Sequence, residues 1–381
     1  MRPSGRWVLQ AGALLLPDGL GGPGFVLIDD GRIAHVGAGM HPRPDLDWSD
    51  AALVPGFVDL QINGAAGCDF LSPTPEGLAA AHAHMVRSGV VAYLPTLISA
   101  PERTLRAALA FFAEHASRSR APRILGVHLE GPFLSPALPG AHSPAYLRPP
   151  SIQWIDSLLA DFRGLVRVIT LAPELTGALD VIEHLVGNGI VVAVGHSAAT
   201  FTEAMAAFDH GARLATHVFN AMRPFHHREP GVSGAALAHP RVTCSLIADI
   251  VHLHPATLRQ VAALKGPERT ALITDGISAA GAKGTHTLGD RVVTVKDGAP
   301  RLPNGTLAGS ILTMDQAVDH MVGVGIDLGD AAMMASLTPA RVLGTDGGVL
   351  AVGRSADLVA LDPSRRVRAT VVGGDLAYLS S

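Results

Sequence analysis

Short apolar runs alternate with helix-like segments along most of this chain of 381 residues, and this alternation constrains the fold more than any other feature. A parallel strand that is buried on both faces reads as a continuous apolar run. Eight such runs lie between residues 53 and 275, at 53–60, 90–96, 123–130, 166–174, 190–196, 213–219, 242–249 and 270–275. Strands that alternate with helices predict a parallel sheet.

The segments between the runs have helical character, for example 76–89, 102–116, 178–189 and 201–211. Three of them end in Gly89, Gly189 and Gly211, and glycine supplies the left-handed residue that ends a helix. Eight strand–helix units in roughly 220 residues indicate a closed (β/α)8 barrel of the TIM type. An open doubly wound sheet is the alternative, but no glycine-rich dinucleotide fingerprint follows the first run.

The two ends of the chain have a different pattern. Residues 1–52 contain a strand–turn–strand with the turn at Asp30-Gly31, and the tail from 346 is also rich in strands and turns. Two β-rich ends that flank a barrel would most simply pair with each other. We therefore expect a small β-sandwich built from residues 1–52 and 346–381, beside a metal-dependent hydrolase barrel over residues 53–345.

Composition excludes several classes of function. Hydrophobic residues make up 48% of the chain and charged residues 16%, which predicts a large core. A net charge of −4 without a dense Lys/Arg run argues against a nucleic-acid or anionic-membrane surface. The only two cysteines, Cys68 and Cys244, exclude a disulfide framework and fit a reducing, cytoplasmic setting. The apolar stretch near the N-terminus is too short to span a bilayer and fits a first strand better.

Four side chains of metal-binding or acid–base type lie at the ends of apolar runs. Glu130 ends the third run and His196 the fifth, His217 lies in the sixth, and Asp275 ends the eighth. Barrels place their chemistry at the carboxyl ends of their strands. Four unrelated polar caps are the alternative, although strand ends are more often closed by Gly, Asn or Ser.

The spacing of these four residues predicts their roles. His196 and His217 are 21 residues apart, which is one strand–helix unit, so their tips should meet on neighbouring strands. With Glu130 they form a set of three protein ligands that leaves a position open for water on a divalent ion. Asp275 can then exchange a proton between water and a leaving group.

Most of the 18 histidines have simpler interpretations. His82 and His84 form an H-x-H inside a helical segment, where residues two apart face nearly opposite ways, so we expect surface or packing roles. His252 is a candidate substrate contact, whereas His254 is expected to be structural. His226 and His227 lie in a polar loop, where the local charge favours a solvated Arg228 paired with Glu229, and Asp249 can simply close its strand.

At these residues a family resemblance becomes clear. The segments VPGFVDLQINGAAGCDF, HLEGPFLS, GAHSP, GHSAAT, THVFNAM, HHREPG, LIADIVHLHP, ITDGISAAG and LAGS follow one another in the order typical of N-acetylglucosamine-6-phosphate deacetylases. The head DGRIAHVG and the tail GGVLAVGRSADLVALD are also similar to the terminal β-sandwich halves of the amidohydrolase superfamily. The resemblance covers nearly the whole chain and implies metal-dependent removal of the N-acetyl group from N-acetylglucosamine 6-phosphate, which releases glucosamine 6-phosphate and acetate.

The resemblance also implies roles for individual positions. Glu130, His196 and His217 match the family's metal ligands, and Asp275 matches its catalytic acid–base. His142 matches a residue close to the acetyl group and the sugar, and it could stabilise the oxyanion. The matched substrate-binding positions are His142, His252 for the sugar, Asn220, Ala221 and Arg228 for the phosphate, and Leu307, Ala308 and Gly309 in the wall of the site. The family is commonly homodimeric, with the phosphate-binding arginine supplied by the partner subunit.

Gln61 and Asn63 stand where many amidohydrolases have an H-x-H pair for a second metal. Neutral amides are poor ligands for zinc or iron beside imidazole and carboxylate. We therefore expect one divalent ion per subunit, zinc first, with iron, cobalt and manganese as alternatives. Gly276, Ile277, Ile250 and Val251 depart from common family residues and could reshape the sugar pocket. Another N-acetyl amino-sugar phosphate as substrate, or a silent scaffold, are the alternative functions.

Overall fold

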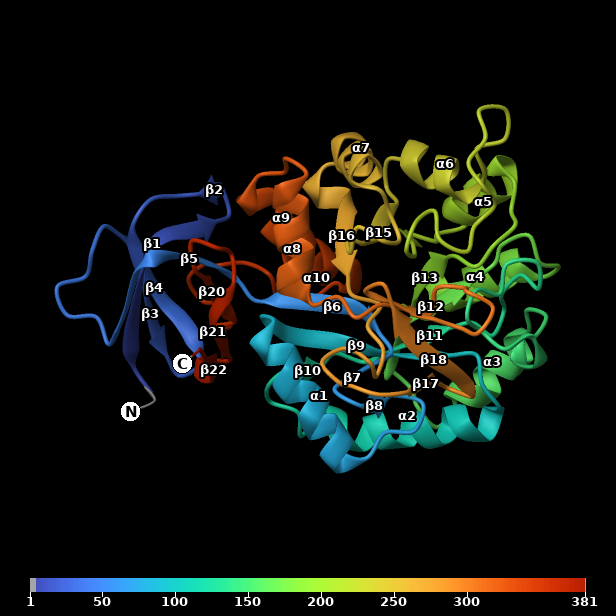
Figure 1. Cartoon of the computed structure of the whole chain (residues 1–381), viewed down its shortest axis with the longest axis horizontal. Coiled ribbons are helices and arrows are strands. Elements are labelled where there is room, and N and C mark those ends of the chain that lie inside the picture. The colour runs from blue at the N-terminus through green and yellow to red at the C-terminus, as the bar shows by residue number, and fades with distance from the viewer. Residues whose placement is uncertain (1–4, 381) are drawn as a thin grey trace.

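The computed structural model describes residues 5–380, which form a barrel and a separate sheet that carries both ends of the chain (Figure 1). Residues 1–4 and 381, which belong to the expected terminal halves, lie outside the described residues. Within 5–380, no helix combines the length and apolar character that a bilayer crossing requires.

Eight parallel strands form the barrel, as the alternation predicted. In chain order they are β6 (Phe57–Ile62), β9 (Val90–Ile98), β11 (Val127–Glu130), β12 (Val166–Leu171), β13 (Val191–Val194), β14 (Leu214–Ala215), β15 (Thr243–Ile247) and β16 (Thr270–Ile273). The short β10 (Arg123–Ile124) extends the pairing of β9. The barrel closes between β16 and β6, where the amide of Asp275 donates to the carbonyl of Gln61 at 2.9 Å. This closure confirms the (β/α)8 prediction.

Helices surround the barrel and join its strands. They are α1 (Pro75–Arg87), α2 (Glu102–Ala116), α3 (Ile152–Leu159), α4 (Ala178–Gly187), α5 (Phe201–Asp209), α6 (Gly231–Ala238), α7 (Pro255–Lys265), α8 (Met314–Gly323), α9 (Leu328–Ala335) and α10 (Leu337–Leu343), with single 3-10 turns at η1 (Pro144–Tyr146) and η2 (Pro267–Arg269). Gly89, Gly189 and Gly211 follow α1, α4 and α5 with positive φ, which confirms the stop signals.

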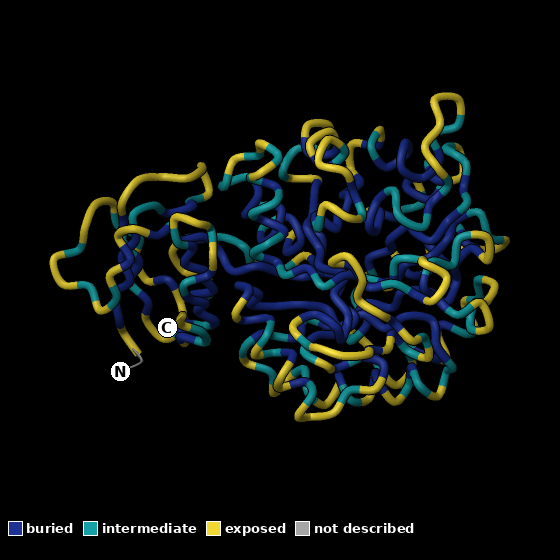
Figure 2. The backbone as a smooth tube through the Cα atoms, viewed as in Figure 1, coloured by how far each residue is buried: buried dark blue, intermediate teal, exposed yellow. Residues whose placement is uncertain are grey.

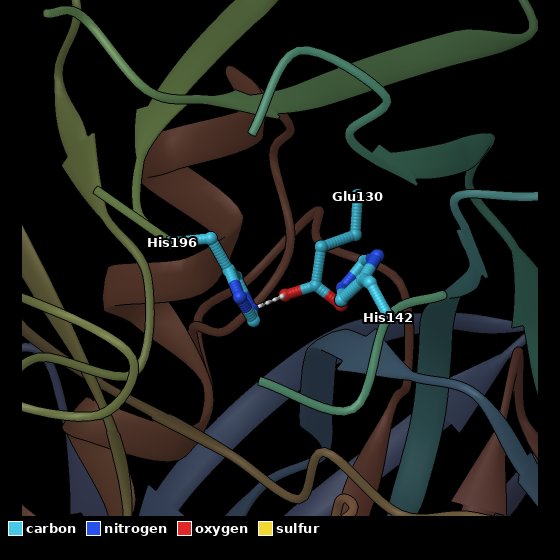
Figure 3. Close-up of side chains that lie close together, drawn as sticks. All are labelled: Glu130, His142 and His196. Carbon is cyan, nitrogen blue, oxygen red and sulfur yellow. Dashed lines mark ion pairs between the residues drawn. The ribbon is translucent and has the colours of Figure 1, made fainter. Parts of the chain in front are cut away.

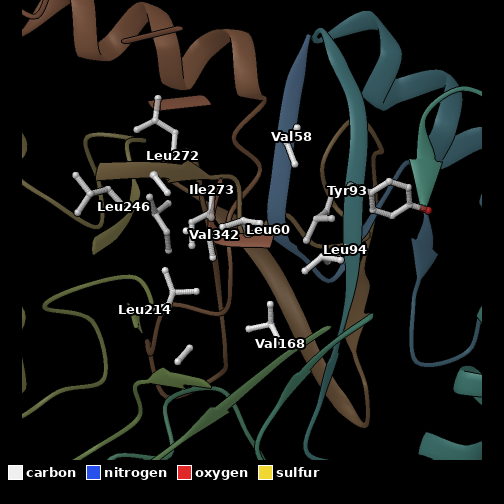
Figure 4. Close-up of a cluster of buried hydrophobic side chains, with 14 of the residues drawn as sticks. Val58, Leu60, Tyr93, Leu94, Val168, Leu214, Leu246, Leu272, Ile273 and Val342 are labelled. Carbon is white, nitrogen blue, oxygen red and sulfur yellow. The ribbon is translucent and has the colours of Figure 1, made fainter. Parts of the chain in front are cut away.

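The barrel strands are buried on both faces, which explains their continuous apolar runs (Figure 2). Side chains from strands on different sides of the barrel meet in one core, drawn in part in Figure 4, which includes Val58, Leu94, Val168, Leu214, Leu246 and Leu272. Close packing of this core fixes the strand positions, and with them the side chains at the strand ends.

The terminal segments meet in a single eight-stranded sheet. Its strands are β1 (Trp7–Leu16), β2 (Gly19–Leu20), β3 (Gly24–Asp29), β4 (Arg32–Ala38), β5 (Leu46–Pro55), β20 (Leu358–Leu361), β21 (Val367–Val372) and β22 (Asp375–Leu379). The edges approach each other, because Ile33 of β4 and Leu376 of β22 lie in the same core as Trp7. The two terminal segments therefore build one curled sheet around a single core, where the sequence predicted the two halves of a small β-sandwich.

The run 53–60 is not one strand. Residues 53–55 belong to β5 of the terminal sheet, whereas the barrel begins at Phe57 in β6. Gly56 lies between them, and a Cβ atom there would collide with the side chain of Val91. An apolar run cannot show that a chain changes sheets when both sheets are buried.

Two smaller sheets lie outside the barrel and the terminal sheet. One is the hairpin of β7 (Gly64–Ala65) and β8 (Cys68–Asp69), and the other comprises β17 (His286–Leu288), β18 (Arg291–Lys296) and β19 (Ala299–Arg301). We call residues 286–307, which contain β17–β19 and the following turn, the flap. The flap is inserted between β16 and α8, after the carboxyl end of the last barrel strand.

Asp59 is a fully buried carboxyl group in β6. It accepts hydrogen bonds from the amides of Gln61 and Thr274 and from the Thr274 hydroxyl, and so ties β6 to the end of β16. Burial raises the pKa of Asp59 to about 7, although these hydrogen bonds act in the opposite direction. The folded protein therefore favours the protonated carboxyl.

We expect Asp59→Asn to remove a pH-dependent part of the stability. The Asp59 pKa is raised to about 7 in the folded state, compared with about 3.9 in unfolded chains. The folded state therefore binds more protons between these values, and wild-type stability decreases as pH rises through that window. An uncharged, nearly isosteric amide lacks this decrease. The variant's stability relative to wild type should rise by roughly 2 kcal/mol between about pH 5 and about pH 8.

Thermal unfolding at several pH values measures this difference. The exposed Asp375 is the matched control, because Asp375→Asn removes a carboxylate that water already solvates. A melting-temperature offset for Asp59→Asn that stays constant with pH would contradict the prediction.

Candidate active site

The predicted site residues meet at the carboxyl end of the barrel. Glu130 is the last residue of β11, His196 and His217 follow β13 and β14 by two residues, and Asp275 follows β16 by two. His196, His217 and Asp275 have positive φ values of 49°, 31° and 49°. A non-glycine residue in this region is strained by about 1–3 kcal/mol and persists only where the surrounding structure enforces it. The closed barrel holds the backbone of these three residues in that conformation.

Glu130 is the centre of the cluster. Its Oε1 lies 3.1 Å from His217 Nε2 and 3.3 Å from His196 Nε2, and these two nitrogens are 3.1 Å apart. The other carboxylate oxygen, Oε2, lies 3.4 Å from His142 Nε2. Figure 3 shows Glu130 between His142 and His196. All four side chains are buried.

Hydrogen bonds assign the protons on two of the imidazoles. His196 Nδ1 lies 3.3 Å from the carbonyl of Leu138, which can only accept, so Nε2 of a neutral ring has a free lone pair. The amide of Ser99 donates to His142 Nδ1 at 3.2 Å, so the proton of His142 is on Nε2 and points at Glu130. His196 is therefore prepared to ligate a cation, and His142 to donate a hydrogen bond.

The cluster fits a divalent cation. Ligands about 2.0–2.1 Å from a tetrahedral zinc ion are roughly 3.3 Å apart, close to the separations of 3.1–3.3 Å between Glu130 Oε1, His196 Nε2 and His217 Nε2. The possible ligand atoms of Glu130, His142 and His196 also lie within 4.8 Å of one another. The proton on His142 Nε2 makes it the weaker candidate, so the set with His217 fits better.

The two carboxyl groups of the site have opposite pKa shifts. Burial alone would raise the pKa of Glu130, but the imidazoles of His142, His196 and His217 around its carboxylate hold that pKa well below its ordinary value. Burial, together with the charge of Glu130, raises the pKa of Asp275 to about 7. Glu130 is thus an anion, whereas Asp275 can gain and lose a proton near neutral pH.

Gln61 and Asn63 hold the carboxylates through hydrogen bonds. Gln61 Nε2 lies 2.8 Å from Glu130 Oε1 and 3.2 Å from Asp275 Oδ1. Asn63 Nδ2 donates to the same Asp275 oxygen at 2.8 Å, and Thr216 fixes the orientation of the Gln61 amide by donating to its oxygen. Amide N–H groups occupy the space where a second cation would need lone pairs.

A cleft of about 510 Å³ opens above this cluster. Its walls include the predicted residues His142, Asn220, Ala221, His252 and Leu307. Ala308 and Gly309 are not part of this wall, because Ala308 is fully buried and the backbone of Gly309 packs against the carbonyl of Asp275. Both residues pack behind the wall that Leu307 lines, and their expected part in the substrate site stays a prediction.

Asp249 does more than close its strand. It accepts hydrogen bonds from the amides of Val251 and His252 and, at 2.7 Å, from His252 Nδ1. Burial opposes ionisation, but the hydrogen bonds from His252 lower the pKa of Asp249. The pair fixes the ring of His252 at the edge of the cleft, and its Nε2 can face a ligand.

Arg228 does not reach the cleft of its own chain. Residues 224–228 form an exposed run in the loop before α6, and Arg228 Nη1 lies 2.9 Å from His227 Nε2. Its expected partner in a solvated pair, Glu229, instead accepts from the amides of Phe201 and Gly231. Arg228 is therefore exposed on the surface and is not part of the wall of this cleft.

His82 and His254 have structural roles of the kind that the sequence suggested. His82 bonds the hydroxyl of Tyr93 at 2.8 Å, and burial lowers its pKa to about 4. His254 caps α7 by accepting from the amide of Ala256. The sequence did not reveal the flap residues Arg301, Asn304 and Thr306 in the cleft wall, because nothing local signals that the turn after β19 folds back over the barrel.

The fold and the cluster define a class: a barrel hydrolase with a candidate metal centre at the strand ends. The chain belongs to the amidohydrolase family, whose family model matches residues 52–377. This family is metal-dependent, and the chain is a hydrolase.

Relatives with named activities cover nearly the whole chain. It is 40% identical to an N-acetylgalactosamine-6-phosphate deacetylase of Escherichia coli, over 97% of this chain and 99% of that protein. It is 39% identical to an N-acetylglucosamine-6-phosphate deacetylase of Homo sapiens, over 87% and 85% of the two chains. A solved Mycobacterium smegmatis N-acetyl-D-glucosamine-6-phosphate deacetylase mutant, in complex with N-acetyl-D-glucosamine-6-phosphate, superposes with a TM-score of 0.95 at 37% identity and covers 99% of this chain and 100% of that one.

Proposed function

We propose that this protein hydrolyses the N-acetyl group of N-acetylglucosamine 6-phosphate, giving glucosamine 6-phosphate and acetate. The observation that carries the proposal is the convergence of Glu130, His196 and His217 on one point, with Asp275 beside them at the floor of a cleft. The named relatives at 39–40% identity support the substrate class.

Glu130, His196 and His217 would hold one divalent ion, zinc first. Such an ion makes water acidic enough to deliver hydroxide near neutral pH and polarises a carbonyl. Asp275, with one oxygen held by Gln61 and Asn63, takes the proton from water and returns it to the amine nitrogen as the C–N bond breaks. His142 donates its Nε2 hydrogen toward the oxygen that becomes negative in the tetrahedral intermediate.

The configuration of the sugar is the main alternative. The Escherichia coli relative at 40% identity is named for N-acetylgalactosamine 6-phosphate, which differs at the C4 hydroxyl. A direct comparison of kcat/KM for the glucosamine-, galactosamine- and mannosamine-type N-acetyl 6-phosphates, measured as acetate release, decides between them. No release from any of the three would remove the proposal.

A catalytically silent scaffold is the alternative from another class. A scaffold has no use for a buried carboxylate with three imidazoles, since burying a charge is costly unless it is compensated. The strained backbone at His196, His217 and Asp275 argues in the same direction.

We further propose that the protein acts as a cytoplasmic homodimer. The two cysteines are free and buried, which fits a reducing compartment. The exposed apolar side chains include Phe225, Ile250, Val251 and Leu264, and Phe225 of the Arg228 loop lines the same groove as Leu264 and His252. Apolar surface of this kind is typical of association sites, and a second copy seated there would bring its Arg228 toward the substrate phosphate.

One divalent ion per chain is the expected metal content, because Gln61 and Asn63 present N–H groups where a second ion would need ligands. Elemental analysis of protein purified without chelator measures the number. His196→Ala should lose the ion, whereas His84→Ala, which alters a histidine of α1 that is in neither the cluster nor the cleft wall, should keep it. Two tightly held ions per chain would show that the single-metal proposal is wrong.

Asp275→Asn should keep the metal and the fold but reduce kcat by about 10²–10⁴-fold, the usual contribution of an acid–base group. The Asn oxygen can still accept from Gln61 and Asn63, so the local structure should persist. Metal analysis and steady-state kinetics on the same preparation separate the roles. Loss of metal together with activity would identify Asp275 mainly as a ligand.

Arg228→Ala should lower kcat/KM for the 6-phosphate substrate. The loss of transition-state stabilisation should be roughly 2–4 kcal/mol, as when one partner of a desolvated charge pair is removed. Turnover of the unphosphorylated sugar should hardly change. Mixing Arg228→Ala with Asp275→Asn chains should restore part of the activity, because a hybrid dimer contains one intact site. Equal losses on both sugars would instead assign Arg228 to the stability of the loop.

A further inference from the structure

The flap brings one cation into the cleft from the same chain. Among the cleft-lining residues of the described chain, Arg301 is the single arginine or lysine. It is the last residue of β19 and pairs across the flap with Thr294 of β18. Asn304, Gly305 and Thr306, from the turn that follows, line the same cleft.

Arg301 is held in place and keeps donors free. Its Nη1 donates to the carbonyl of Gly305 at 3.0 Å, and no ion pair within residues 5–380 includes it. Guanidinium has five N–H donors, so most of them remain for a ligand. The turn is internally bonded, with the amide of Leu302 donating to Thr306 at 2.9 Å and the amide of Gly305 to Leu302 at 2.8 Å.

The flap itself is anchored to the rest of the barrel mouth. Asp69 of β8 accepts from the amide of Gly289 at 2.8 Å, and the Ser278 hydroxyl donates to the carbonyl of Thr287 at 3.0 Å. A side chain on an anchored flap loses little further entropy when it binds a ligand, which favours a recognition role over that of a mobile surface arginine.

The charges of the cleft show what Arg301 can bind. Glu130 and Asp275 provide two carboxylates on its floor, which a divalent ion would balance. A phosphate monoester carries about −1.5 to −2 charges near neutral pH and needs a further cation in the cleft. Arg228 of the same chain is not in the cleft wall, whereas Arg301 is. The planar fork of guanidinium suits phosphate oxygens better than a point charge does.

We propose that Arg301 is an own-chain contact of the substrate phosphate, which acts together with the Arg228 that a second copy would supply. This inference rests on the proposed function, because it assigns a residue to the recognition of a sugar phosphate. It makes phosphate recognition partly independent of the dimer.

Kinetics on phosphorylated and unphosphorylated sugars test the inference. Arg301→Ala should lower kcat/KM for the 6-phosphate by about 10- to 100-fold, as for the loss of a hydrogen bond to a charged group, mainly through KM. The unphosphorylated sugar should change little, and Arg301→Lys should recover part of the loss. Arg291→Ala, on the same flap but outside the cleft wall, is the matched control. Equal losses on both sugars, or none on either, would overturn the assignment.

A binding measurement separates this inference from the deacetylase proposal. Glucose 6-phosphate has no acetyl group, so calorimetry with the metal-loaded protein measures its affinity without turnover, and glucose is the unphosphorylated reference. We expect Arg301→Ala to weaken the affinity for glucose 6-phosphate by a similar factor, with the metal content and the melting temperature unchanged. Normal affinity in the variant, in a wild-type protein that does deacetylate, overturns the role of Arg301 alone. If glucose 6-phosphate binding depends on Arg301 but the wild type does not deacetylate, the role of Arg301 is supported and the proposed reaction is wrong. A wild type that neither binds glucose 6-phosphate nor deacetylates overturns both proposals.

Discussion

The buried carboxylate of Glu130 is the constraint on which the rest of the site depends. A charge removed from water is stable only if several groups compensate it, and here three imidazoles and the Gln61 amide surround it. These partners come from β6, β13, β14 and the loop after β11, so the charge can be satisfied only once the barrel has closed. The complete set of partners around Glu130 therefore exists only in the closed barrel.

Closure also accounts for the strain at the strand ends. His196, His217 and Asp275 have positive φ, each at a cost of about 1–3 kcal/mol. The close-packed core beneath them fixes where each strand ends, and backbone bonds such as that from the Asp275 amide to the Gln61 carbonyl hold the turns. Catalytic barrels carry their active sites at this end of the strands, and strained backbone residues cluster at active sites. The side-chain amides of Gln61 and Asn63 orient the carboxylates of Glu130 and Asp275 through hydrogen bonds without adding charge to the site.

Much of the architecture was predictable from local pattern. The apolar runs correspond to the eight barrel strands, and glycines end the helices where expected. The boundary at 53–60 could not be placed, because β5 and β6 belong to two sheets that are both buried and differ in no local property except Gly56. The family resemblance implied Leu307, Ala308 and Gly309 in the wall of the site, but only Leu307 lines the cleft, because Ala308 is fully buried and Gly309 packs against the backbone of Asp275.

The sequence by itself determined the alternation of strands and helices and the four metal-binding or acid–base side chains at or near the ends of the apolar runs, because periodicity and chain order are local properties. Only the tertiary structure decided that Glu130, His196 and His217 lie at the separation of ligands on one metal ion, and that the amide of Ser99 leaves the His142 proton on Nε2. It also decided that Arg301 lines the cleft of its own chain, whereas Arg228 does not. The side-chain contacts among these residues join positions 21 to 87 apart in the chain. Distances of that kind arise from barrel closure and flap placement, which no local pattern encodes.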